Sequence, residues 1–160
     1  MKKVQINFDI EECQSLDDLT AQDKKLVEKA KEATKSAYAP YSKFHVGAAL
    51  LLENGEIITG TNQENSAYPS GLCAERVALF YANSKYPDVA VKTLAVCAFY
   101  NGEFTPVPTP PCGSCRQVML ETETRFDSPI KILLFGKEKI LIIPNSKSLL
   151  PLSFTGDNLI

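Results

Sequence analysis

One continuous apolar run decides the fold: Val46-Gly47-Ala48-Ala49-Leu50-Leu51-Leu52. It lies within a strand predicted from Phe44 to Glu53, and its unbroken apolar character favours burial of both faces of that strand. Asn54-Gly55 follows, and this dipeptide is a strong signal for a tight hairpin turn. A second strand is therefore expected over residues 56–60. The hairpin supplies at least one antiparallel pair, so the sheet is expected to be mixed.

Helical and extended patterns alternate along the rest of the chain. Thr20 can cap a helix whose apolar face extends to Ala37, before the segment Tyr38-Ala39-Pro40 ends it. Two more helices are predicted over about residues 72–84 and 112–122, and three more strands over residues 92–100, 130–135 and 139–143. This alternation predicts the α/β class, with helices on the faces of one sheet.

Two further patterns make weaker predictions. Near the start of the chain, a period-two alternation predicts a short strand at a sheet edge, and its apolar members are Val4, Ile6, Phe8 and Ile10. In the helix over residues 72–84, the side chains expected to point mostly inward are those of Val77, Ala78, Phe80 and Tyr81.

The bulk properties indicate one globular domain. The chain has 160 residues, of which 44% are hydrophobic and 22% charged. Its net charge of −2 and pI of about 5.5 argue against a polynucleotide partner, since such proteins usually carry a basic surface. We expect no secretory signal, because polar and acidic residues alternate with the apolar ones at the start of the chain, and no membrane span, because no apolar run is long enough. Five cysteines then suggest free or metal-bound thiols in a reducing cytoplasm.

Two short motifs carry the chemistry, Cys73-Ala74-Glu75 and Pro111-Cys112-Gly113-Ser114-Cys115. Zinc deaminases combine [His/Cys]-x-Glu with Pro-Cys-x-x-Cys, where three ligands hold Zn²⁺ and the glutamate transfers protons. Cys73 and Cys112 each stand where a helix is expected to begin, and unpaired amides there stabilise a thiolate. The sequence therefore predicts one Zn²⁺ bound by Cys73, Cys112 and Cys115, with Glu75 as general acid and base.

Three thiolates leave a zinc site with a net charge of −1, which a nearby cation can offset. Arg76 and Arg116 each follow a predicted ligand, and Arg76 is the stronger candidate for a hydrogen bond to sulfur. The alternatives to this site are a structural zinc with Cys97 or His45 as fourth ligand, and a redox pair. Cys97 has apolar strand neighbours, and a redox pair of Cys112 and Cys115 leaves the first motif unexplained.

With these motifs in place, the sequence resembles the cytidine deaminase family, in particular its small homotetrameric class with three cysteine ligands. Four stretches carry the resemblance: Tyr38–Leu50, Gly60–Tyr68, Pro111–Val118 and Leu149–Phe154. The resemblance implies a three-layer α/β/α fold with a mixed central sheet. It extends from about Ala21 to Phe154, so we expect a catalytic domain over residues 21–160 and an N-terminal extension over residues 1–20. The segment Pro69-Ser70-Gly71 departs from the family pattern.

The resemblance also implies a reaction and a set of substrate contacts. Cytidine and 2′-deoxycytidine would be hydrolysed to uridine and 2′-deoxyuridine plus ammonia, a step of pyrimidine salvage. Zinc-bound hydroxide would attack C4 while Glu75 shuttles protons. Asn62 and Glu64 would bind the ribose, and Phe44 would pack near the sugar and base. Phe154 and Tyr68 would contribute across subunits of a homotetramer with shared active sites.

Other functions stay open at this point. A related zinc deaminase acting on a free base, a nucleotide or an aminoacyl-nucleoside antibiotic would carry the same two motifs. A non-catalytic structural-zinc protein is a further alternative, and an RNA- or DNA-editing deaminase is disfavoured by the acidic pI. The carboxylate of Glu64 would repel a phosphate, whereas it can accept a hydrogen bond from a ribose hydroxyl.

Overall fold

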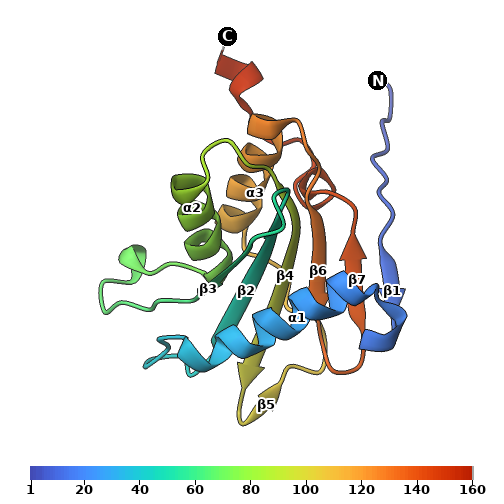
Figure 1. Cartoon of the computed structure of the whole chain (residues 1–160). Coiled ribbons are helices and arrows are strands. Elements are labelled where there is room, and N and C mark those ends of the chain that lie inside the picture. Colours follow the sequence, from blue (N-terminus) through green and yellow to red (C-terminus); the bar gives the residue numbers. More distant parts are fainter. Residues whose placement is uncertain (160) are drawn as a thin grey trace.

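The computed structural model describes residues 1–159 as one mixed sheet with helices on both faces (Figure 1). The strands follow the order β1-β7-β6-β4-β2-β3, and β5 pairs with β4. The strands are β1 (Glu11–Cys13), β2 (His45–Leu52), β3 (Ile57–Thr61), β4 (Val91–Tyr100), β5 (Glu103–Phe104), β6 (Lys131–Phe135) and β7 (Ile140–Ile143). The α-helices are α1 (Ala21–Ala33), α2 (Ala74–Lys85) and α3 (Gly113–Phe126). The predicted α/β class and layered architecture are confirmed.

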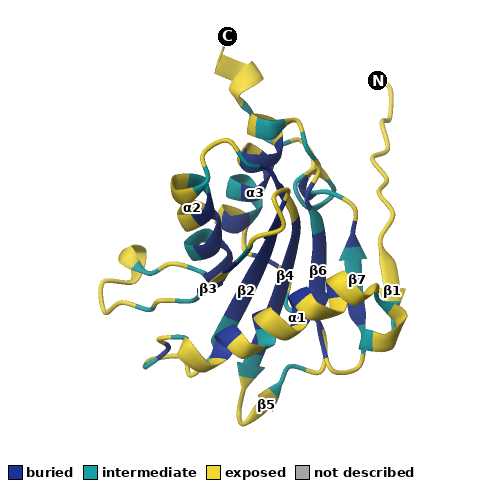
Figure 2. Cartoon of the chain, in the orientation of Figure 1, coloured by how far each residue is buried: buried dark blue, intermediate teal, exposed yellow. Residues whose placement is uncertain are grey.

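The central hairpin forms as its sequence predicts. β2 and β3 pair in antiparallel register, and Gly55 adopts a φ of 85° in the turn between them. β2 also pairs antiparallel with β4, whereas β4 and β6 are parallel, so the sheet is mixed. Six consecutive residues of β2, from Gly47 to Leu52, are buried, which agrees with a strand covered on both faces (Figure 2).

Two hydrophobic cores lie on opposite faces of the sheet. One packs α2 and α3 against residues such as Leu50, Leu94 and Ile132, and the other packs α1 against residues such as Ala49 and Ala95. Gly60 in β3 allows α2 to approach closely, because a Cβ there would lie 2.5 Å from the carbonyl oxygen of Ala74. This close approach sets the first turn of α2 directly against the sheet.

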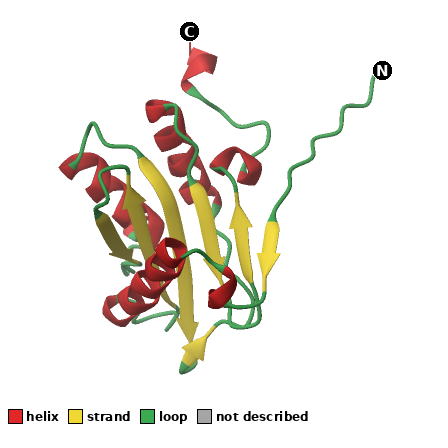
Figure 3. Ribbon diagram, turned by 45° about the vertical axis from the view of Figure 1, so that its right-hand side comes forward, coloured by secondary structure: helices red, strands yellow, loops and turns green. Residues whose placement is uncertain are grey.

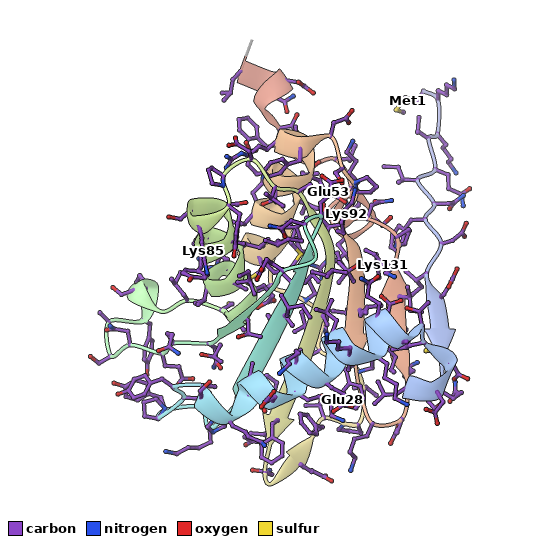
Figure 4. All side chains as sticks on the ribbon, in the orientation of Figure 1. Met1, Glu28, Glu53, Lys85, Lys92 and Lys131 are labelled. Carbon is purple, nitrogen blue, oxygen red and sulfur yellow. The ribbon has the colours of Figure 1, made fainter. Side chains whose placement is uncertain are left out.

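The first helix begins as predicted but ends earlier. The side chain of Thr20 accepts a hydrogen bond from the amide of Asp23 at 3.2 Å, which confirms the cap. The α-helix ends at Ala33, and a 3₁₀ turn over Thr34–Ser36 replaces the last turn expected up to Ala37. Lys131, labelled in Figure 4, forms an ion pair of 2.6 Å with the buried Asp23 and so joins α1 to β6.

The prediction for α2 is partly wrong. Ala78 is buried, but Phe80 is 47% exposed and Tyr81 53% exposed. The inner face of the helix is formed by Ala74, Ala78, Leu79 and Ala82, so both aromatic rings lie on the opposite side. Apolar residues therefore line both faces of this helix, one towards the sheet and one towards solvent.

The strand predicted over residues 4–10 is also wrong. The strand that forms is β1, over Glu11–Cys13, and it occupies the predicted edge position beside β7 (Figure 3). β7 ends at Ile143, so it offers no strand opposite residues 1–9. Whether residue 20 divides the chain into an extension and a domain stays a prediction, since β1 lies before that point yet belongs to the sheet.

None of the helices within residues 1–159 has the length and apolar content that a membrane crossing requires.

Candidate active site

Two helix N-termini bring three cysteines together. Cys73 is the N-cap residue of α2, Cys112 is the N-cap residue of α3, and Cys115 lies in the first turn of α3. The three sulfur atoms all lie within 4.8 Å of one another. Sγ of Cys112 is 3.7 Å from that of Cys73 and 3.5 Å from that of Cys115. The cysteines that the sequence groups together are thus adjacent in space, although 39 residues separate the two caps.

The cluster has a buried and an accessible side. Cys115 is buried, Cys73 is intermediate and Cys112 is exposed. A hydrogen bond from Cys115 lowers the pKa of Cys73 to about 5, and the same bond raises the pKa of Cys115. Cys73 is therefore a thiolate at neutral pH, which is the form that binds metal.

These donors fit a zinc ion. Sulfur from three cysteines is a ligand set that suits Zn²⁺, and three protein ligands leave the fourth tetrahedral position free for water or substrate. The caps place two of the sulfurs at the positive ends of helix dipoles, where negative charge is stabilised. The group can hold one metal ion.

Glu75 lies in the first turn of α2, two residues after Cys73. Its side chain is almost wholly buried, and the residue is 4% exposed. Burial raises the pKa of this carboxyl group, with the neighbouring thiolate of Cys73 acting in the same direction. A carboxyl group that holds a proton more tightly than usual, on the wall of a cavity, is suited to proton transfer.

The two arginines have different environments. Nη2 of Arg76 donates to Sγ of Cys73 at 3.9 Å, and its buried Nε has no hydrogen-bond partner within residues 1–159. Arg116 instead donates to the main-chain oxygens of Pro111 and Leu149, each at 2.8 Å. Arg116, the weaker of the two candidates for a bond to sulfur, therefore holds the loop before α3 to the C-terminal segment.

A cavity of about 870 Å³ opens beside the sulfur cluster. Four of the five predicted substrate contacts line it, namely Phe44, Asn62, Glu64 and Tyr68. Cys73, Glu75, Arg76 and Cys112 line the same cavity. The structure thus gathers the predicted proton carrier, two of the predicted ligands and most of the predicted substrate contacts around one space.

Asn62 and Glu64 hold the cavity wall together through the main chain. The amide of Asn62 accepts from the N–H of Val46 and donates to the carbonyl oxygen of Phe44, both at 2.8 Å. The carboxylate of Glu64 accepts from the amides of Tyr41 and Ser42 and from the Ser42 hydroxyl. The bonds of both residues fix their side chains in the cavity wall. Those accepted by Glu64 also lower the pKa of its carboxyl group, and the bond from the Ser42 hydroxyl has the largest effect.

Phe154 is the predicted contact that lies elsewhere. It does not line the cavity of its own chain and is 59% exposed. The side chain of Gln117 donates to the carbonyl oxygen of Phe154 at 2.9 Å, which ties the C-terminal segment to α3. The sequence offered no signal for this contact, because 37 residues separate its partners.

The remaining candidates for a fourth ligand lie away from the cluster. Cys97 packs in the core beneath α1, on the opposite face of the sheet from Cys115, and its sulfur donates to the carbonyl oxygen of Val27 at 3.7 Å. His45 is likewise outside the metal-binding group found among the described residues. The cluster therefore offers three protein ligands, the number found in catalytic zinc sites that keep a fourth position for water or substrate.

Comparison with known proteins decides the family. A family model described as "Cytidine and deoxycytidylate deaminase zinc-binding region" matches residues 20–126, which include the three clustered cysteines and Glu75. The chain belongs to this family. The matched region of the family is zinc-binding, in agreement with the donor set of the sulfur cluster.

Individual members of the deaminase family are similar over most of their length. The cytidine deaminase of Halalkalibacterium halodurans is 46% identical over 98 residues, which make up 60% of this chain and 68% of that protein. The cytidine deaminase of Sporosarcina psychrophila is 52% identical over 97 residues, 61% of this chain and 67% of that protein. The crystal structure of cytidine deaminase from Burkholderia pseudomallei superposes with a TM-score of 0.70 at 36% identity, covering 85% of this chain and all of that one.

Proposed function

We propose that this protein hydrolytically deaminates cytidine and 2′-deoxycytidine, giving uridine and 2′-deoxyuridine plus ammonia. The observation that carries the proposal is the meeting of the three sulfurs with the buried Glu75 at the wall of one cavity. Membership of the deaminase family and identities of 46% and 52% to cytidine deaminases support the same reaction. A salvage role in pyrimidine metabolism follows from the product.

Cys73, Cys112 and Cys115 would hold the zinc ion. Bound there, Zn²⁺ supplies a Lewis acid that lowers the pKa of water towards neutrality. Arg76 donates to Cys73 and supplies a positive charge beside the three thiolates. Its buried Nε has no hydrogen-bond partner within residues 1–159, so it keeps one further donor.

Glu75 would transfer the protons of the reaction. Water adds to C4 of the pyrimidine and gives one proton to the carboxylate, which passes it to N3. The carboxylate then takes the second proton from the C4 hydroxyl and delivers it to the departing amine, so that the C4–N bond breaks and leaves a carbonyl and ammonia. Burial suits the group to this task, because its raised pKa brings it closer to the pH at which it must both accept and donate. Three cysteines already supply the protein ligands of a catalytic zinc, so Glu75 on the same cavity wall does not need to act as a metal ligand.

Phe44, Asn62 and Glu64 would form the nucleoside pocket. Glu64 keeps a low pKa and remains a carboxylate, which favours a neutral ribose over a phosphate. The main-chain bonds of Asn62 and Glu64 fix the orientation of both groups before substrate enters. Each group keeps free hydrogen-bonding capacity, since a carboxylate has about four acceptor sites and an amide two donors.

We also propose a homotetramer with shared active sites, in which Tyr68 and Phe154 reach neighbouring subunits. Tyr68 is 78% exposed and Phe154 59% exposed, and Phe80 and Tyr81 on α2 are 47% and 53% exposed. Aromatic residues are enriched at protein–protein interfaces relative to the rest of the surface. The molar mass in solution, measured by light scattering, tests this assembly. The cytoplasm is the proposed location, since its reducing conditions keep cysteines from forming disulfides, and all five cysteines lack one here.

The reaction is tested with purified protein and a substrate panel of cytidine, 2′-deoxycytidine, cytosine and deoxycytidine monophosphate. Turnover is followed by the fall in absorbance and by ammonia release, with and without a zinc chelator. The proposal expects turnover of both nucleosides, its loss with the chelator, and its return on adding Zn²⁺. Turnover of the free base or the nucleotide alone, or activity that survives removal of the metal, would contradict it.

A further inference from the structure

The first residues of the chain form an extended arm with an apolar face. Residues 1–10, here called the N-terminal arm, leave the sheet edge and project away from the body, with Met1 at the far end (Figures 1 and 4). Four apolar residues along the arm are exposed to solvent: Val4 by 80%, Ile6 by 52%, Phe8 by 50% and Ile10 by 46%. Within the described chain, no main-chain hydrogen bond joins residues 1–9 to another segment. The arm also precedes the region that the family model matches.

The register of β1 shows which way this face points. Glu12 lies opposite Leu141, which packs in the core beneath α2 and α3, whereas Cys13 lies opposite Ile140 in the core beneath α1. Side chains alternate along a strand, so even-numbered positions continue the face that α2 and α3 cover. Val4, Ile6, Phe8 and Ile10 all occupy even positions, so in a strand that continued β1 they would extend that face beyond the sheet.

We propose that the N-terminal arms of two copies of this chain pair as antiparallel strands about a twofold axis at Asn7. In this register the numbers of facing residues sum to 14. Val4 then faces Ile10 of the partner subunit, and Ile6 faces Phe8 of the partner subunit. Lys2 faces Glu12 of the partner subunit, and Lys3 faces Glu11 of the partner subunit.

Charge and apolar patterns select this register over its neighbours. A shift by one residue places the apolar side chains of one arm on one face of the paired strands and those of the other arm on the opposite face, so that they no longer meet. A shift by two in one direction sets Lys2 opposite an isoleucine, and in the other direction sets Val4 opposite a glutamate. The proposed register sets Val4, Ile6, Phe8 and Ile10 opposite apolar residues of the partner arm and both lysines opposite glutamates, and such cross-strand pairs are the stabilising contacts of a sheet.

The sheet has a free edge that can accept this pairing. β7 occupies one side of β1, and β1 is the last strand of the sheet, so its outer edge is unpaired within residues 1–159. An exposed edge with an apolar face otherwise favours open-ended aggregation. A twofold pairing of identical arms closes the contact, because each arm satisfies the other.

A cysteine at the axis tests the register. In a Cys13→Ser background, Asn7→Cys places two thiols opposite each other, and facing antiparallel residues have Cα atoms about 4.5–5.5 Å apart, within disulfide range. Mild oxidation is expected to give a covalent dimer, with peptide mass spectrometry assigning the bond to position 7 of both chains. Gln5→Cys and Asp9→Cys are the matched controls, since each alone is out of reach of its own copy. The double variant Gln5→Cys/Asp9→Cys should cross-link again.

A charge exchange tests the pairing independently of cysteine geometry. Glu12 also pairs with Lys139 at 2.8 Å, so the exchange uses Lys3 and Glu11. In the Asn7→Cys chain, Lys3→Glu or Glu11→Lys should slow cross-linking about threefold or more, because each sets like charges opposite each other twice. The double exchange should restore the rate. Failure of Asn7→Cys to cross-link, or equal cross-linking of the single controls, would overturn the proposal and leave the arm to another partner; neither readout uses enzymatic activity.

Discussion

Nη2 of Arg76 lies 3.9 Å from Sγ of Cys73, and the two residues stand one helical turn apart at the start of α2. The contact puts a cation beside the sulfur whose pKa falls to about 5, with the Cys115 hydrogen bond as the largest cause and Arg76 a further one. Three thiolates and Zn²⁺ carry a net charge of −1, which would weaken the activation of water. We propose that Arg76 offsets that charge.

Replacing Arg76 with glutamine should therefore lower kcat/KM. Loss of a partner that hydrogen-bonds a metal ligand typically costs about 10- to 100-fold in activity or metal affinity. Steady-state kinetics with cytidine, together with the zinc content of the purified variant, would measure the effect. Arg125→Gln is the control, since Arg125 bonds to the carbonyl oxygen of Pro87 near the far end of α3. Equal activity of the Arg76 variant and the native protein would show that the charge is offset elsewhere.

Glu75→Gln should abolish turnover while leaving the metal bound. Glutamine has nearly the same shape, so the packing of this buried side chain is kept, but it cannot accept and return a proton. General acid–base catalysis contributes about 10²- to 10⁴-fold, and kcat should fall by at least that factor. Zinc analysis should still give one ion per chain. The exposed Glu121→Gln serves as control, and a Glu75 variant that keeps native kcat would remove the group from the mechanism.

The C-terminal segment should affect substrate binding through Phe154. If its ring stacks on the pyrimidine bound in a neighbouring subunit, Phe154→Ala should raise KM by about 5- to 150-fold, the range expected for the loss of one stacked base. Gln117→Ala should raise KM less, because it loosens the 2.9 Å bond that holds the segment without removing the ring. Leu152→Ala is the control, since that side chain is 93% exposed. Native KM values for both variants would place Phe154 outside the active site.

The sequence predicted those parts of the fold that have local signals. Asn54-Gly55 marks a turn wherever it falls between two strand patterns, and Thr20 caps a helix through a bond to its own third neighbour. The sulfur cluster was predictable for a related reason, since Cys112 and Cys115 are one helical turn apart. The pattern could not show that Phe80 and Tyr81 face solvent, because periodicity reveals an apolar stripe but not which stripe meets the sheet.

Long-range contacts of side chains with the main chain account for most of what the sequence could not predict. Arg116 follows a cysteine ligand directly, yet its side chain reaches a carbonyl oxygen 33 residues away in the C-terminal segment. The residue alternation around Ile6 and Phe8 is real, yet a strand needs a partner and β7 ends too early to provide one. Such contacts depend on where the sheet and helices finally pack, which no local spacing records.

Cys97 should make the stability of the protein fall at high pH. Its thiol lies in the core of β4 and donates to the carbonyl oxygen of Val27, and burial raises its pKa well above the usual range. In the folded chain the thiol therefore stays neutral, whereas in the unfolded chain it ionises at about pH 8.5. The stabilisation is fully present below that pH and is lost above it, because the unfolded state gains free energy by releasing the proton. Relative to Cys97→Ala, the native protein should lose about 2 kcal/mol of unfolding free energy between about pH 7.5 and about pH 10. Denaturant titrations of both proteins at these pH values measure the difference, and parallel pH profiles would show that Cys97 does not titrate on unfolding.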